Sequence, residues 1–165
     1  HWDQMSSLKS FLVDTNRFSG TLPTELGLLT GLQFLSLSNN SLTGTIPTEL
    51  GRMTELQFAY LSGNGFTGTL PLELAELDGL VGLDISMNAL TGTLPTEWSG
   101  LSNLTLFSFD RNNFTGSVSD LFCATGNSSR WEVLKGDCLD DGSGPVEIDC
   151  DCCTSCCNFN GSICA

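Results

Sequence analysis

The sequence predicts an α/β solenoid, in which one short unit repeats along an axis and builds a parallel β-sheet on its inner face. The first observation is a fixed period of 24 residues, seen in the asparagines Asn16, Asn40, Asn64, Asn88 and Asn112. The second is that a glycine four residues after each asparagine keeps the same step. A proline three residues after that glycine keeps it too, except in the last unit, where serine replaces it.

Each unit opens with alternating apolar residues, as at Leu35 and Leu37. This alternation predicts a short strand with one buried face. Because identical positions stack in successive coils, we expect the strands to form one parallel sheet on the inner curve. The asparagine after each strand can donate to and accept from backbone groups that would otherwise be buried without partners. We therefore interpret the five asparagines as scaffold.

The second half of each unit leaves the sheet. A threonine–glycine pair followed by a proline predicts a tight turn, since glycine permits unusual backbone angles and proline cannot donate to a ladder. The next residues, as in 47–51, are expected to form a short helical turn on the outer face. A glutamate in its first turn suits the helix dipole. These glutamates are Glu25, Glu49, Glu73 and Glu97.

We divide the chain into three parts. Residues 1–7 are an N-terminal stub without a full cap, residues 8–122 hold five repeats, and residues 123–165 form a cysteine-rich C-terminal cap. Solenoids need an end that covers the apolar edge of the last coil. The cap contains all the cysteines, an even number that indicates an oxidising compartment and disulfides of unassigned pairing. They are Cys123, Cys138, Cys150, Cys152, Cys153, Cys156, Cys157 and Cys164.

From Leu8 to about Val118 the full unit reads LxxLxLxxNxLTGTIPTELGxLxxL. This unit resembles the plant-type leucine-rich repeat of receptor-kinase ectodomains and polygalacturonase-inhibiting proteins. The C-terminal tail is similar to tails of leucine-rich repeat proteins from algae and diatoms. The resemblance implies a right-handed coil with a concave parallel sheet and short helical or 3-10 turns on the convex face. It also implies ligand binding on the concave face and no catalytic chemistry.

The net charge bears on the partners of the chain, and the cysteines and sequons bear on its location, which we expect to be extracellular. The net charge of −13, from 19 acidic and 6 basic residues, argues against nucleic acid and anionic lipid as partners. No apolar run approaches the roughly 18 residues that cross a bilayer. The chain begins without a signal peptide, and we expect a secreted or cell-surface product whose targeting segment is missing. N-x-S/T sequons fit this route as N-glycosylation candidates. They are Asn39, Asn103, Asn113, Asn127 and Asn160.

Groups that could carry catalysis are sparse. His1 is the only histidine, so no two-histidine metal site exists and no histidine base can serve a Ser or Cys nucleophile. Asp14 and Asp84 fall about three coils apart, roughly 15 Å, too far for an acid–base pair. The G-x-G-x-x-G at 63–68 spans the repeat's asparagine and turn glycine, and no helix-opening βαβ unit follows it. We expect no enzyme, no cofactor and no metal.

Strand positions that alternate with the buried ones should face solvent on the inner sheet. Aromatic side chains at such positions are candidate contacts, because interfaces favour aromatic anchors. Asn39 lies within this area, where a glycan would obstruct a large ligand. The candidate contacts are Leu12, Phe34, Phe58, Tyr60, Asp84, Leu106, Asp110 and Arg111.

Three functions are compatible with these features. The first is a non-catalytic extracellular scaffold that binds a protein, peptide or glycan through its concave face. The second is a structural glycoprotein that self-assembles head to tail into a filament or wall component, because an open coil edge exposes apolar core and unpaired strand groups. The third is binding to ice or a polysaccharide surface through a threonine row. That row is Thr43, Thr67, Thr91 and Thr115.

Overall fold

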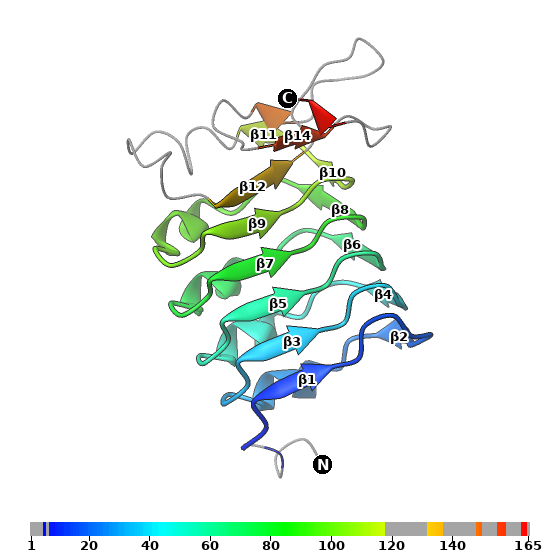
Figure 1. Cartoon of the computed structure of the whole chain (residues 1–165), viewed down its shortest axis with the longest axis vertical. Helices are drawn as coiled ribbons and strands as arrows, with labels where there is room; N and C mark the ends of the chain where they lie inside the picture. The colour runs from blue at the N-terminus through cyan, green and yellow to red at the C-terminus, as the bar shows by residue number, and fades with distance from the viewer. Residues whose placement is uncertain are drawn as a thin grey trace.

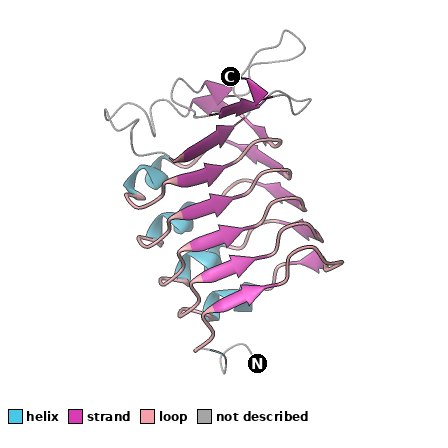
Figure 2. Ribbon diagram, viewed as in Figure 1, coloured by secondary structure: helices cyan, strands magenta, loops and turns pink. Residues whose placement is uncertain are grey.

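The computed structural model describes residues 5, 7–117, 132–136, 148–149, 155–157 and 163–164. Residues 8–117 stack as a series of similar coils, and in each of the first four an inner strand is followed by a second strand and a short helix (Figure 1). Figure 2 shows that the inner strands lie along one face and the helices along another. The predicted solenoid is therefore confirmed.

The inner strands described by the structure form one sheet in the order β1-β3-β5-β7-β9-β12-β14-β15. Neighbours from β1 to β14 are parallel, and β15 closes the sheet in the antiparallel direction. Equivalent residues of successive units are in register, as Phe34 with Phe58 and Phe58 with Gly82. The strands are β1 Ser10–Leu12, β3 Phe34–Ser36, β5 Phe58–Tyr60, β7 Gly82–Asp84, β9 Leu106–Ser108, β12 Val133–Gly136, β14 Ser155–Cys157 and β15 Ile163–Cys164.

A second parallel sheet, in the order β10-β8-β6-β4-β2, occupies the segments where the sequence predicts only a tight turn. Glycine is nevertheless required there. Gly44 has a φ of +79°, and a Cβ on it would lie 2.8 Å from Thr21 Cγ2 of the preceding coil. The strands are β2 Ser19–Thr21, β4 Ser41–Gly44, β6 Gly65–Gly68, β8 Ala89–Gly92 and β10 Asn113–Phe114. A further short pair joins β11 Gly116–Ser117 to β13 Ile148–Asp149.

The predicted helical turns are 3-10 helices, each preceded by the proline of its repeat. Successive helices approach closely where a glycine faces the next coil. A Cβ on Gly51, for example, would lie 2.8 Å from the carbonyl carbon of Glu73. The helices are η2 Thr24–Leu28, η3 Thr48–Arg52, η4 Leu72–Glu76 and η5 Thr96–Gly100.

The core is a continuous column of leucines that becomes aromatic in the last coils. Trp98 and Phe107 replace leucines of earlier repeats and are fully buried. The Phe107 ring lies 5.9 Å from Trp98 and 4.8 Å from Phe109, measured between ring centroids. Phe109 in turn contacts Phe114 at 6.3 Å. These rings extend the same core with larger side chains.

The asparagine ladder is confirmed at four of the five predicted positions, whereas Asn16 in the first coil donates to carbonyls of its own coil. Asn64 Nδ2 donates to the carbonyls of Leu61 in its own coil, at 3.1 Å, and of Leu37 in the preceding coil, at 3.0 Å. Its Oδ1 accepts from the Leu42 backbone N–H at 3.0 Å. Each such side chain therefore ties two coils together. The same arrangement occurs at Asn40, Asn88 and Asn112.

The inner sheet continues into the segment assigned to the cap. Val133 of β12 pairs with Leu106, and Leu134 pairs with Phe107 and is fully buried. One strand of the predicted cap thus packs as a further coil. Several predicted features lie outside the described residues: His1, Cys123, Cys138, Cys150, Cys152, Cys153, Asn127 and Asn160. The backbone alone is described at Cys156, Cys157 and Cys164, so the disulfides stay a prediction.

Candidate functional site

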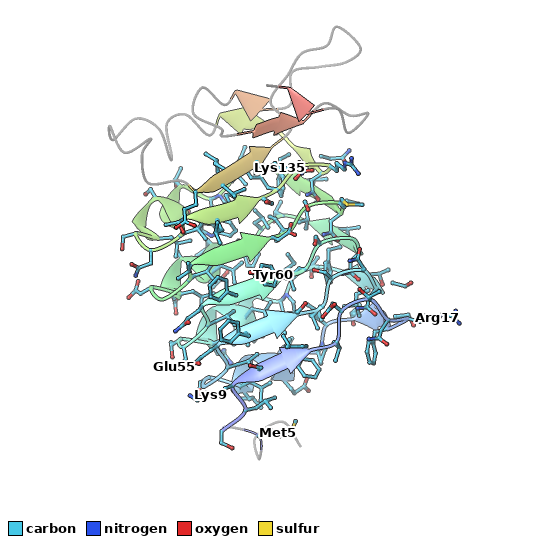
Figure 3. All side chains as sticks on the ribbon, in the orientation of Figure 1. Met5, Lys9, Arg17, Glu55, Tyr60 and Lys135 are labelled. Carbon is cyan, nitrogen blue, oxygen red and sulfur yellow. The ribbon has the colours of Figure 1, made fainter. Side chains whose placement is uncertain are left out.

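Three aromatic side chains, Phe34, Phe58 and Tyr60, form an aromatic cluster on the inner sheet. Phe34 and Phe58 stand in register on adjacent strands, and their rings stack with centroids 5.2 Å apart and planes 9° apart. Tyr60 projects from the same face of β5, because residues two apart share a face. The centroid of its ring lies 6.2 Å from that of Phe58. Tyr60 is labelled on the inner sheet in Figure 3.

The aromatic cluster is partly open to solvent. Phe34 and Tyr60 are each 37% exposed, and Leu12 on the neighbouring β1 is 62% exposed. Ser36 stands between Leu12 and Tyr60 in the sheet register and is buried. Adjacent exposed apolar side chains on one rigid sheet are typical of an interaction surface.

Gly82 gives the cluster its shape, a role that was not predicted from the sequence. It follows Phe58 in the register, and a Cβ on Gly82 would lie 2.7 Å from Phe58 Cδ1. The Phe58 ring therefore leans over the bare backbone of the next strand. The absent side chain is the feature of the sequence from which this packing could have been inferred.

Carboxylates border the aromatic cluster on both sides. Asp84 stands in register with Tyr60, and its Oδ1 accepts hydrogen bonds from the Ser86 backbone N–H at 3.0 Å and from Ser86 Oγ at 2.6 Å. Asp14 accepts from Ser36 Oγ at 3.2 Å. The Asp84 carboxylate is therefore held in a fixed orientation beside Tyr60. Asp14, in contrast, is exposed and bonds to Ser36, the register neighbour of Tyr60 on its other side.

The structure corrects the prediction that Asp110 faces solvent as a candidate contact. The alternation places it on the solvent-facing side, but it is only 2% exposed. Strand β12 extends the sheet past this position, and Lys135 Nζ lies 3.4 Å from Asp110 Oδ2. Arg111 Nε lies 4.0 Å from the same oxygen and stays exposed. Asp110 thus links β12 to the preceding coil and is not open to a partner.

Replacing Lys135 by methionine is expected to lower the free energy of unfolding by about 1 to 2 kcal/mol, because the buried Asp110 carboxylate loses its nearest cation. Lys135 is about a third exposed, so water replaces part of the lost interaction. Urea titration measures the change. The control is Arg111→Met, which removes the more distant cation and should cost less than about 0.5 kcal/mol. Equal losses from both variants would contradict this account.

The predicted contact residues separate into three groups. The aromatic cluster brings Phe34, Phe58 and Tyr60 together, with Leu12 and Asp84 at its border. Leu106 lies beyond Gly82 in the register and is half-buried. Arg111 lies after β9, toward the other end of the sheet from Leu12. The structure therefore concentrates the candidate surface on β1, β3, β5 and β7.

Three sequons fall on described residues, and all three asparagines are exposed: Asn39, Asn103 and Asn113. Asn39 follows β3 with a φ of +55°, and a Cβ on Gly63 would lie 2.6 Å from its Oδ1. Asn103 Nδ2 donates to the Asp78 carbonyl at 2.7 Å. Their exposure is compatible with glycans, and glycan attachment stays a prediction.

The threonine row of the second sheet has a structural role. Thr43 and Thr67 donate their hydroxyl protons to glycine carbonyls of the preceding coil, at 3.3 and 3.4 Å. Thr115 does the same at 3.5 Å. Threonine at these positions therefore joins adjacent coils.

Within the described ranges, no three His, Cys, Asp or Glu side chains gather closely enough to hold a metal ion. No helix in that part of the chain is long and apolar enough to cross a membrane.

Comparisons with known proteins identify the repeat. The Leucine Rich Repeat family model matches residues 31–53 and 55–77. No curated protein sequence matches the chain. Among solved structures, the ectodomain of the Arabidopsis thaliana receptor kinase GASSHO1/SCHENGEN3, in complex with CASPARIAN STRIP INTEGRITY FACTOR 2, is 33% identical over 90% of this chain, with a TM-score of 0.76.

Two further structures have the same architecture. The Arabidopsis receptor kinase HAESA, in complex with the peptide hormone IDA and the co-receptor SERK1, is 32% identical over 82% of this chain, with a TM-score of 0.72. The BIR3–SERK2 complex from Arabidopsis thaliana is 32% identical over 65% of this chain, with a TM-score of 0.62. This chain spans 18% of the GASSHO1/SCHENGEN3 chain, 22% of the HAESA chain and 57% of the matched chain of the BIR3–SERK2 complex.

Proposed function

We propose that this chain, a leucine-rich repeat solenoid of the plant type, is a non-catalytic extracellular module that binds a protein or peptide on its inner sheet. Two similar structures support a peptide or protein partner, since HAESA is in complex with a peptide hormone and a co-receptor, and BIR3 is in complex with SERK2. The chain spans only part of those proteins, so the chemistry of its own partner has to follow from the residues on its own surface.

The observation that carries the proposal is the aromatic cluster. A β-sheet of this kind buries its leucines on one face, and nothing in the repeat requires aromatic side chains on the other. Phe34 and Tyr60 are nevertheless exposed there, on strands held rigidly by the asparagine ladder. Exposed aromatic side chains on a rigid scaffold lose little conformational freedom on binding and often act as interface anchors.

An extracellular location is supported by three features of different kinds. The similar structures include receptor-kinase ectodomains. The sequence carries an even number of cysteines in its C-terminal part, typical of an oxidising compartment. Exposed sequons at Asn39, Asn103 and Asn113 fit passage through the secretory route.

A peptide-display experiment tests the proposal. Peptides are selected from a random phage library on the glycosylated chain, and their affinities are then measured for variants. Phe58→Ala and Tyr60→Ala should each weaken binding by about tenfold or more, because each removes an aromatic anchor. The matched control is Leu72→Ala on η4, which removes a 53% exposed apolar side chain away from the inner sheet. Its effect should stay below about twofold.

Binding that survives Phe58→Ala and Tyr60→Ala would place the contact elsewhere and defeat the proposal. Head-to-tail assembly and binding to ice or polysaccharide are the alternative hypotheses. Sedimentation of the glycosylated chain at micromolar concentration tests assembly directly. Discrete monomers contradict the filament hypothesis, whereas long polymers would make the coil ends, rather than the inner sheet, the functional surface.

A further inference from the structure

We infer that the contact segment of the partner is cationic, with a lysine or arginine side chain between the Tyr60 ring and the Asp84 carboxylate and a neighbouring apolar side chain on Phe34 and Phe58. The inference rests on the proposed function, because it names the chemistry of the partner at the same surface. It excludes an acidic segment and a neutral glycan as the preferred occupant.

Tyr60 and Asp84 together offer the two groups that hold a cation. They stand in register on adjacent strands, about 4.8 Å apart along the sheet. A cation over the exposed Tyr60 ring gains from the electron density of its face. The same cation can donate a charge-assisted hydrogen bond to the Asp84 carboxylate. Because Ser86 already orients this carboxylate through two hydrogen bonds, little rearrangement is needed on binding.

The charges around the aromatic cluster favour the same partner. Asp14 and Asp84 border it, and Glu55 lies at the edge where the strands begin. Lys9 is labelled near the same edge in Figure 3, and its backbone carbonyl accepts from the Phe34 N–H at 3.0 Å, so one base also lies at this end of the cluster. With a net charge of −13, the whole chain also attracts cationic segments over longer distances.

The basic residues at the far end of the inner sheet do not reverse this preference. Lys135 lies 3.4 Å from the buried Asp110 carboxylate, which offsets its charge. Arg111 follows β9, beyond the strand that carries Asp84. An acidic segment at Tyr60 would therefore face the Asp84 carboxylate on the adjacent strand. Lys9 lies instead at the Phe34 end of the cluster, where its carbonyl accepts from the Phe34 N–H.

The ring geometry favours an apolar side chain over a sugar at the two phenylalanines. Phe34 and Phe58 stack face to face, with planes 9° apart, and the Phe58 ring also leans over Gly82. The face that each ring turns to the other is closed. A sugar that stacks on an aromatic residue needs an open ring face, whereas an aliphatic side chain can pack against ring edges.

Two synthetic peptides test the inference by fluorescence anisotropy. One carries a leucine flanked by lysines, and the other replaces those lysines by glutamates. The lysine peptide should bind the wild-type chain, and higher salt should weaken it. Asp84→Asn should weaken it about threefold or more, while the carboxamide oxygen still accepts from Ser86. The control Glu73→Gln on η4 changes the net charge equally and should alter affinity by less than about 1.5-fold.

Several outcomes would overturn the inference. They are equal effects of Asp84→Asn and Glu73→Gln, equal binding of the two peptides, and no binding of the lysine peptide to the wild-type chain. The phage-selected peptides distinguish a failure of this inference from a failure of the proposed function. Selected peptides that depend on Phe58 but lack lysine and arginine would reject the cationic partner alone. Selected peptides whose affinity is unchanged in Phe58→Ala would reject the aromatic cluster as the binding surface.

Discussion

Replacing Asn112 by alanine is expected to lower the free energy of unfolding by about 3 to 5 kcal/mol. The side chain is 3% exposed and links two coils. Its Oδ1 accepts from the Leu90 N–H, and its Nδ2 donates to the carbonyls of Ile85 and Phe109, each at 3.0 Å. Alanine leaves one buried donor and two buried acceptors without these partners, and each such loss costs about 1 to 3 kcal/mol.

Urea unfolding followed by circular dichroism measures this loss, and Asn16 provides the matched control. Asn16 is exposed, and its Nδ2 donates to Val13 and Asp14 of its own coil, at 3.1 and 2.9 Å. Because water can replace these bonds, Asn16→Ala should cost less than about 1 kcal/mol. If Asn112→Ala were no more destabilising than Asn16→Ala, the ladder would not be the main polar link between coils.

Gly51→Ala is expected to lower the free energy of unfolding by about 2 to 3 kcal/mol through overpacking. A Cβ on Gly51 would lie 2.8 Å from the backbone carbonyl carbon of Glu73, and backbone cannot rotate aside as a side chain can. The helices η3 and η4 must then separate. Ala75 occupies the equivalent position one coil later, so the requirement for glycine depends on the local spacing of two helices.

Gly100→Ala is the control for Gly51→Ala, because a Cβ on Gly100 would meet no heavy atom within 4 Å. The free energy of unfolding of the Gly100→Ala protein should change by less than about 0.5 kcal/mol, or rise slightly, because alanine reduces the conformational freedom of the unfolded chain. Thermal and urea unfolding of both variants provide the comparison. A Gly51→Ala protein as stable as wild type would show that the outer helices are loosely packed.

Much of the fold could be predicted because the period of Asn16 to Asn112 repeats without insertion. A constant step forces equivalent residues to stack, so the strand of one unit specifies the strands of all the others. The second sheet could not be predicted in the same way. In a single unit, Thr43 and Gly44 resemble a turn, and their segment becomes a strand only when the neighbouring coils supply pairing partners.

The candidate site could be predicted in position but not in packing. Alternation correctly places Phe34, Phe58 and Tyr60 on the open face of the sheet. It does not show that Phe58 leans over Gly82, which depends on the absence of an atom in the next coil. It also misplaces Asp110, because β12 lies outside the regular period and brings Lys135 against it.

Hydroxyl-radical footprinting of the chain with a phage-selected peptide tests the central claim most directly, since mass spectrometry reports the oxidation of each side chain with and without the peptide. We expect protection of Phe34 and Tyr60, both 37% exposed on the inner sheet. Phe18 and Leu72, 51% and 53% exposed elsewhere, should be oxidised equally in both samples. Protection of Phe18 or Leu72, with Phe34 and Tyr60 unchanged, would contradict binding at the aromatic cluster.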